Sequence, residues 1–482
     1  MNIRAISRNV GIALMVSALF MFISVLVSII YGVDSSFSPL LLSGILTFLA
    51  GIFPIIFVPR NHSEITTREG VVIIVVSWVL SCVFGMMPYV LWGGEFTLVN
   101  AWFESVSGFT TSGGTILNDI EALPHGLLFW RSSTHYIGGL GVVLFMLIIL
   151  PNVGTVKWRI SRMEVADVSR VNYNYKTNKI IKVILSVYLG LTALLFVLLF
   201  IAGMSPFDAI NHALSIVSTG GFSTKNASIG AFNSPLIEVI SMAFMILGSI
   251  HFGLLYSSVK HNNLNVFKDP IVQFYLMSLL VASVLVSVNL ITSGTYNSVW
   301  ETIRQAFFNV ISLGSSSGFT ISDTALWPPF SILILLYMSV QCGCSGSTTG
   351  GLKADRVWII TKATRSQLLR TLHPNAVIPV KYGKNIADPA LVQSVAIFAL
   401  FYMLCCLFFA LIYAAVGLDF MDSTTASIAM IGNIGPAFGS LGAFSNFAAV
   451  PAIGKLVMGI EMIAGRLGLY ALVILFIFNK RI

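Results

Sequence analysis

The sequence predicts an all-α polytopic membrane protein with four span–pore-loop–span repeats in a pseudo-fourfold arrangement around one pore, preceded by an N-terminal pair of spans. Composition is the first indication: 56% of the 482 residues are hydrophobic and only 10% are charged, whereas soluble domains carry about 25% charged residues. The second is that many apolar segments approach 20 residues, enough to cross a hydrocarbon core of about 30 Å. The third is a short Gly/Ser/Thr strip that recurs four times.

Two spans are expected first, over about 9–31 and 39–58, and four units follow them. Each unit contains a span, a short amphipathic helix, a polar strip and a second span. The short helices cannot cross a bilayer, so each must enter and leave on the same side. In that order, the segments expected for the first unit are 70–92, 98–110, 110–115 and 125–150, and those for the second are 179–202, 206–217, 218–224 and 234–258. The third unit is expected at 270–292, 299–313, 314–321 and onward from 328, and the fourth at 388–415, 419–431, 432–439 and 451–478. The corresponding divisions of the chain are 1–62, 63–165, 166–264, 265–380 and 381–482.

The four strips have the composition that a cation filter requires. Glycine adopts positive φ at little cost, and carbonyl oxygens turned to an axis replace the hydration shell of an ion. One such strip alone could be an ordinary turn, but four of them after four short helices predict a selectivity filter. We place marker glycines at 113, 220, 318 and 435, with Ser317 as an alternative in the third strip. The expected filter residues are Thr110, Thr111, Ser112, Gly113, Ser218, Thr219, Gly220, Gly221, Ser315, Ser316, Ser317, Gly318, Gly432, Asn433, Ile434 and Gly435.

A second polar stretch interrupts the last apolar segment of the third unit. Irregular backbone at membrane depth must be packed in protein or line a cavity, so the stretch is expected to form a gate beneath the filter; a loop at the membrane edge is the alternative. Arg466 lies within the last span, and intramembrane arginines usually face an interior cavity. It could oppose cation passage, bond to loop carbonyls, or pair with Glu461 or Glu238. The expected gate residues are Gly343, Cys344, Ser345, Gly346, Ser347, Thr348, Thr349, Gly350, Gly351 and Arg466.

The net charge of +8 is concentrated on one side of the expected membrane topology. Basic residues cluster at 157–182 and 353–384, in two shorter connections and at the ends of the chain. The positive-inside rule then makes both termini cytoplasmic, and this distribution favours a membrane topology over nucleic-acid binding. His135, His212 and His251 lack metal-ligand spacing, and the five cysteines form no disulfide or zinc pattern. These residues therefore indicate a transported cation as the ligand, with no organic cofactor; the resemblance described next implies that the cation is K⁺.

Several motifs together resemble the Trk/Ktr/HKT superfamily of potassium transporters, most closely the bacterial TrkH type. They are Phe103-Glu104-Ser105 before the first strip, Pro206-Phe207-Asp208-Ala209-Ile210 before the second, the 343–353 stretch, His373-Pro374 and Gly465-Arg466-Leu467. The resemblance covers essentially the whole chain, including the leading span pair. It implies a homodimer in a bacterial inner membrane, one pore per protomer, and a cytosolic TrkA-type nucleotide-binding partner on the basic face. It also implies that 343–351 is a gating loop and that Arg466 lines the pore.

Two features depart from the pattern of that superfamily. An acidic residue often follows the pore arginine by two positions, where this chain has Gly468, and the third strip has serines where threonines are usual. The predicted function is potassium uptake, not enzymatic catalysis. An intramembrane serine protease using Gly343-Cys344-Ser345-Gly346 with His251 is one alternative. It is disfavoured, because so short a motif can match by chance. An alternating-access carrier is the other, although it would be built of two inverted halves.

Overall fold

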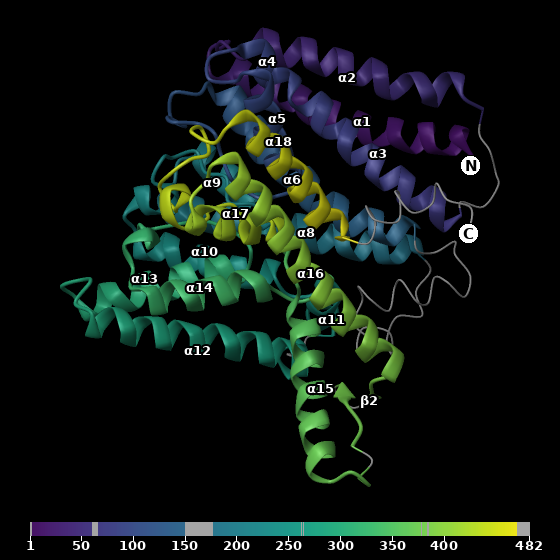
Figure 1. Ribbon diagram of the computed structural model, residues 1–482. Helices are drawn as coiled ribbons and strands as arrows, with labels where there is room; N and C mark the ends of the chain where they lie inside the picture. Colours follow the sequence, from purple (N-terminus) through teal and green to yellow (C-terminus); the bar gives the residue numbers. More distant parts are fainter. Residues whose placement is uncertain are drawn as a thin grey trace.

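The computed structural model describes residues 2–59, 66–149, 177–261, 263, 265–376, 378–382 and 385–469. The leading pair of spans is confirmed as α1 (Ile3–Ile30) and α2 (Phe37–Phe57), which lie side by side in Figure 1. The two helices approach closely at Gly11 and Gly51, because an ideal Cβ on Gly11 would lie 2.5 Å from the Gly51 carbonyl oxygen. Small residues allow this backbone contact between membrane helices.

The predicted all-helical architecture of four successive units is confirmed. The first unit contains α3 (Thr67–Gly85), α4 (Met87–Trp92), α5 (Leu98–Phe109) and α6 (His125–Ile149). The second contains α8 (Thr177–Ile201), α9 (Pro206–Val217), η3 (Ser228–Phe232), α10 (Pro235–Gly248) and α11 (Phe252–Lys260). The third contains η4 (Asn265–Lys268), α12 (Pro270–Thr292), α13 (Val299–Gly314), η5 (Thr324–Leu326), α14 (Pro329–Gln341) and α15 (Ala354–Leu372). The fourth contains α16 (Pro389–Val416), α17 (Phe420–Gly432), η6 (Gly439–Leu441) and α18 (Ala452–Leu467), preceded by a two-residue hairpin of β1 (Lys381–Tyr382) and β2 (Asn385–Ile386).

Six of the described helices are long and apolar enough to cross a membrane, or seven if α10 and α11 count as one span. Each of the short helices α5, α9, α13 and α17 is preceded by a polar residue, and in α5 and α9 the side chain of that residue caps the helix. Thr97 Oγ1 accepts from the Asn100 N–H at the start of α5, and Ser205 Oγ accepts from the Asp208 N–H at the start of α9. Such caps satisfy the first free amides of a helix. In Figure 1, α9 and α13 lie at the left, whereas the N-terminus lies at the right.

Two segments expected to be continuous spanning helices are interrupted in the structure. The segment predicted as one span over 234–258 is broken between α10 and α11, which meet at 103°. The break has a partner, because the Ser249 carbonyl accepts from the Cys344 N–H of the third unit at 2.9 Å. The last span, expected over 451–478, has α18 ending at Leu467, where Gly468 takes φ +84°. The rest of that expected span, and most of the basic segment 157–182, lie outside the described residues.

A buried ion pair lies within the first unit, and its arginine also contacts the second unit. Arg131 Nε on α6 lies 2.8 Å from Glu104 Oε1 on α5, and both side chains are at most 1% exposed. Glu104 also accepts from the Ile116 N–H, and Arg131 Nη1 donates to the Ser223 carbonyl. The Arg131 guanidinium carbon lies 4.0 Å from the centre of the Phe222 ring. The pair therefore positions the chain just beyond the first and second strips.

Replacing Glu104 with alanine is expected to destabilise the protein strongly. Removing one partner of a buried pair leaves an uncompensated charge and costs about 3–5 kcal/mol. Thermal unfolding of the purified protein in detergent measures the loss. The control is Glu121→Ala, since Glu121 and Lys225 form a partly exposed pair at 3.3 Å, worth about 0–1 kcal/mol. Equal melting temperatures for the two variants would contradict this account.

Candidate ion pathway

The four strips share one backbone conformation. In each, two residues have positive φ and are separated by one residue that does not. The pairs are Thr111 and Gly113 (54° and 81°), Thr219 and Gly221 (53° and 92°), Ser316 and Gly318 (51° and 71°), and Asn433 and Gly435 (50° and 96°). The equivalent glycine of the second strip is therefore Gly221, so the predicted marker Gly220 is wrong by one residue. In the third strip the equivalent residue is Gly318, and the alternative Ser317 is the middle residue.

The strips contact one another in a closed ring. An ideal Cβ on Gly113 would lie 2.2 Å from the carbonyl oxygen of Gly220 in the next strip. An ideal Cβ on Gly221 would likewise lie 2.5 Å from the Ser317 carbonyl oxygen. For Gly318 the distance to the Ile434 oxygen would be 2.0 Å, and for Gly435 the distance to the Ser112 oxygen would be 2.4 Å. Every contact runs from a third-position glycine to a middle-position carbonyl, and the fourth strip returns to the first. Glycine is thus required twice, for positive φ and for this approach.

The short helices orient the strips through equivalent hydrogen bonds. The middle residue of each strip donates its N–H to a carbonyl five residues earlier, in the last turn of the preceding helix. The pairs are Ser112 to Ser107 (2.9 Å), Gly220 to Ser215 (2.8 Å), Ser317 to Ser312 (2.9 Å) and Ile434 to Ala429 (3.0 Å). Each helix therefore directs its C-terminal end, which carries a partial negative charge, at a strip. Four such ends favour a cation at the centre of the ring.

Polar side chains on the short helices also hold the segment that follows each strip. The bonds are Thr115 Oγ1 to Glu104 (3.0 Å), His212 with Ser223 Oγ (3.0 Å), Asn309 Nδ2 to Ser322 Oγ (2.9 Å) and Thr425 Oγ1 to the Phe438 carbonyl (3.2 Å). His212 is therefore a buried hydrogen-bonding residue, and His135 likewise bonds Ser215 Oγ at 3.0 Å. No group of three or more potential metal-ligating His, Cys, Asp or Glu side chains occurs within the described part of the chain.

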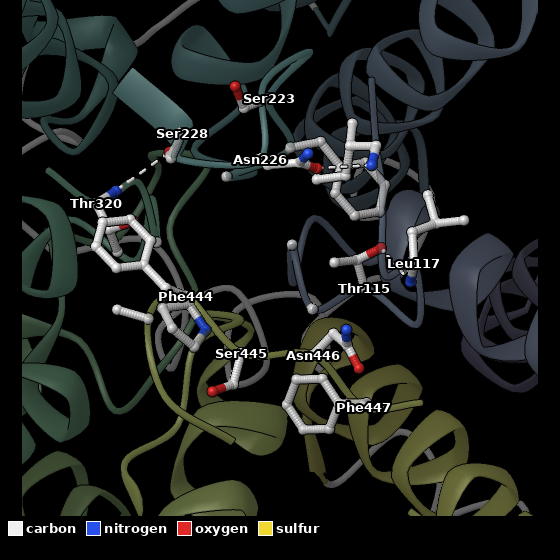
Figure 2. Close-up of a pocket in the computed structure, with 18 of the residues that line it drawn as sticks. Thr115, Leu117, Ser223, Asn226, Ser228, Thr320, Phe444, Ser445, Asn446 and Phe447 are labelled. Atoms are coloured by element: carbon white, nitrogen blue, oxygen red, sulfur yellow. Dashed lines mark hydrogen bonds between the residues drawn. The ribbon is translucent and has the colours of Figure 1, made fainter. Parts of the chain in front are cut away.

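A pocket of about 110 Å³ opens on one side of the ring. Figure 2 shows Thr115, Asn226, Thr320 and Asn446, one from each unit, around an open centre. At its rim Asn226 Nδ2 donates to Asp119 at 2.8 Å. This bond holds the pKa of Asp119 below its ordinary value. The sequence did not identify Asn226 or Asn446 as pocket residues, because they follow their strips at unequal distances.

The stretch 343–351 lies on the opposite side of the ring, with Cys344, its hydroxyl residues and Gly350 buried. Thr348 Oγ1 donates to the Val217 and Gly248 carbonyls at 3.2 Å. The Gly350 N–H donates to Ser316 Oγ at 3.0 Å, and an ideal Cβ on Gly350 would lie 2.0 Å from the Gly432 oxygen. The stretch therefore contacts the second, third and fourth units directly. The alternative of a loop at the membrane edge is wrong.

Arg466 lies beside this loop in the last turn of α18. Its Nη1 donates to the Thr348 carbonyl at 2.6 Å, and its Nε and Nη2 have no hydrogen-bond partner among the described residues. The expected alternative of an ion pair is wrong, because Glu461 bonds Ser427 and Glu238 lies 3.5 Å from Arg304. A buried positive charge bound to a loop carbonyl thus stands beneath the ring.

The residues of the protease alternative are closer than the sequence indicates. An ideal Cβ on Gly346 would lie 2.2 Å from His251 Cδ2. However, His251 Nδ1 accepts from the Gly253 N–H and caps α11, while the Ser345 N–H donates to Asp355. These bonds use His251 Nδ1 and the Ser345 backbone to pack the loop against α11 and α15, and no hydrogen bond joins Ser345 to His251 among those of the described residues.

Known proteins resemble this chain over nearly its full length. A family model described as TrkH, cation transport protein, matches residues 41–480. The Trk system potassium uptake protein TrkH of Salmonella typhimurium is 32% identical, with 99% of each chain covered, and TrkG of Escherichia coli K12 is 32% identical, with 98% of each covered. The crystal structure of the potassium transporter TrkH from Vibrio parahaemolyticus superposes with a TM-score of 0.89 at 29% identity, covering 98% of each chain. The chain therefore belongs to the TrkH family of cation transport proteins.

Proposed function

We propose that this protein carries potassium ions into a bacterial cell across the inner membrane, through the ring formed by its four strips. The closed series of contacts between strip glycines and strip carbonyls carries the proposal, because it brings four equivalent backbone oxygens to one place. Backbone carbonyls bind a dehydrated cation without a fixed charge. The relatives named as potassium uptake proteins support K⁺ as the ion.

In this proposal the divisions 63–165, 166–264, 265–380 and 381–482 are four pore repeats, and 1–62 is an accessory pair of spans. The basic connections 260–268 and 353–384 face the cytoplasm, as do both termini. The pocket with Asp119 at its rim is then the outer mouth. The cytoplasmic face binds a TrkA-type nucleotide-binding subunit, and the protein is a homodimer with one pore in each protomer.

K⁺ enters the mouth, exchanges water for the carbonyl oxygens of the strips, and passes inward toward the 343–351 loop. The loop closes the path by its bonds to the second and third strips. Arg466 adds an electrostatic barrier at the same level, since it is buried and binds the loop through Thr348. Movement of the loop, under control of the cytosolic subunit, opens the path. The membrane potential drives the ion at about 2.3 kcal/mol per charge per 100 mV.

Uptake of rubidium and potassium into a strain lacking its own potassium systems tests the function. Expression of this protein with a TrkA-type subunit is expected to restore uptake and growth at low potassium, and expression without the subunit to give less. Ser345→Ala is expected to retain uptake, whereas it would abolish a serine protease. A strain that gains no uptake despite membrane-inserted protein would overturn the proposal.

Gly113→Ala is expected to weaken discrimination between K⁺ and Na⁺ by about tenfold, equivalent to about 1.4 kcal/mol in relative affinity. The added methyl group would displace the Gly220 carbonyl from the ring. The measurement is competition of Na⁺ with rubidium uptake. Gly203→Ala is the matched control, because Gly203 also has positive φ (103°) but an added Cβ meets nothing within 4 Å. If both variants keep the wild-type selectivity, the ring is not the filter.

Arg466→Ala is expected to raise flux. A unit charge about 8 Å from a passing ion opposes it by about 2 kcal/mol at an effective dielectric of 20, so flux should rise more than about tenfold. Rubidium flux into proteoliposomes measures this change. Arg466→Lys keeps the charge and should keep flux low. A well-folded alanine variant with reduced flux would contradict the barrier role.

A further inference from the structure

A groove of about 500 Å³ lies between α12 and α14, two helices that run side by side in Figure 1. Its lining is apolar and aromatic and includes Met277, Val281, Leu285, Leu333 and Tyr337. These side chains remain well exposed, Met277 by 59% and Leu333 by 65%. Because α12 is a spanning helix, the groove opens to the hydrocarbon of the bilayer, not to water.

The length of the groove matches one leaflet. Its lining residues on α12 run from Phe274 to Leu285, and at 1.5 Å per residue they span roughly 16 Å. Half of a hydrocarbon core of about 30 Å is about 15 Å. An extended acyl chain of a single phospholipid would therefore fill the groove from end to end.

Phe274 forms one end of the groove, and a tryptophan and a lysine of α15 lie beside it. The Phe274 ring centre lies 5.2 Å from that of Trp358 on α15, and Lys362 Nζ lies 4.4 Å from the Trp358 ring centre. Arg365 follows on the same face of α15, three residues after Lys362. Tryptophan and basic side chains are typical of the level of lipid headgroups, and basic residues attract anionic lipids on the cytoplasmic side.

We propose that an anionic phospholipid of the inner leaflet binds here, with one acyl chain between α12 and α14 and its phosphate beside Lys362. The inner-leaflet assignment rests on the orientation given under the proposed function. The apolar groove selects a chain, and Lys362 with Arg365 selects a negatively charged headgroup over a zwitterionic one.

The acyl chain of the bound lipid would also lie close to the residue where the 343–351 loop leaves α14. Gln341 is the last residue of α14, and its Nε2 donates to Ser278 Oγ at 2.6 Å. Ser278 lines the groove, and the 343–351 loop follows Gln341 after the single C-cap residue Cys342. An acyl chain in the groove therefore packs against the helix end from which the loop must move. This link connects lipid occupancy to the ease of opening.

The test is native mass spectrometry of the delipidated full-length protein after addition of dioleoyl phosphatidylglycerol or dioleoyl phosphatidylcholine. The wild type is expected to retain the anionic lipid preferentially, by about fivefold. Lys362→Gln should remove that preference, and Lys362→Arg should keep it. Val281→Trp fills the groove and should reduce retention of both lipids. Val284→Trp is the matched control, because Val284 is similarly exposed (47% against 49%) and does not line the groove.

Equal retention of the two lipids by the wild type would overturn the proposal, as would equal retention by the Val281→Trp and Val284→Trp variants. Conversion of a dimer to a monomer by Val281→Trp, with lipid retention unchanged, would assign the groove to an interface between copies and also overturn it. The readout is binding, so it is independent of transport. Failure of rubidium uptake would leave the lipid result standing, and loss of lipid selectivity would leave the proposed function standing.

Discussion

The pathway depends on the close approach between a glycine Cα in one strip and a carbonyl oxygen in the next. Only a residue without Cβ permits it, because an added atom would lie 2.0–2.5 Å from that oxygen in all four cases. The same glycine has positive φ, and the N–H of the middle residue before it is bonded to the short helix. The backbone thus sets the geometry of the ring, and strip side chains add contacts to it. Asn433, which stands where the other strips have Thr or Ser, donates from Nδ2 to Ser112 Oγ of the first strip at 2.9 Å.

Fourfold regularity ends beneath this ring. The second helix of the first unit, α6, continues over 25 residues, whereas α10, α14 and α18 all end early, after 14, 13 and 16 residues. The 343–351 loop packs against the broken end of α10, where the Cys344 N–H donates to the Ser249 carbonyl and Thr348 Oγ1 donates to the Gly248 carbonyl. A nearly fourfold ring and an asymmetric loop beneath it are therefore built by one chain.

Buried charge is handled differently on the two sides of the ring. On the pocket side Arg131 is neutralised by Glu104, and the pair orients backbone without leaving net charge. On the loop side Arg466 binds a carbonyl and has no ion-pair partner among the described residues, while Glu461 is satisfied by the hydroxyls of Tyr413 and Ser427. The buried arginine on the loop side is therefore not compensated by a carboxylate, which is the basis of the barrier proposed for it.

The sequence by itself determined the features that arise from local chemistry. Apolar length defined the spans, as with α12, whose predicted limits agree with those found, and short amphipathic segments between a span and a polar strip defined the four short helices. The recurrence of Gly, Ser and Thr after each helix located the strips. These properties depend on neighbours in the chain, so they can be read in order along it.

Tertiary structure decided what depends on contacts through space. The equivalence of Gly221 and Gly318 with Gly113 follows from φ and from the facing carbonyl, neither of which Ser-Thr-Gly-Gly or Ser-Ser-Ser-Gly specifies. The bend between α10 and α11 exists because a loop from another unit supplies its hydrogen bonds. The partner of Arg466 is a carbonyl 118 residues away in the sequence. Sequence spacing does not show which of several buried groups would be that partner.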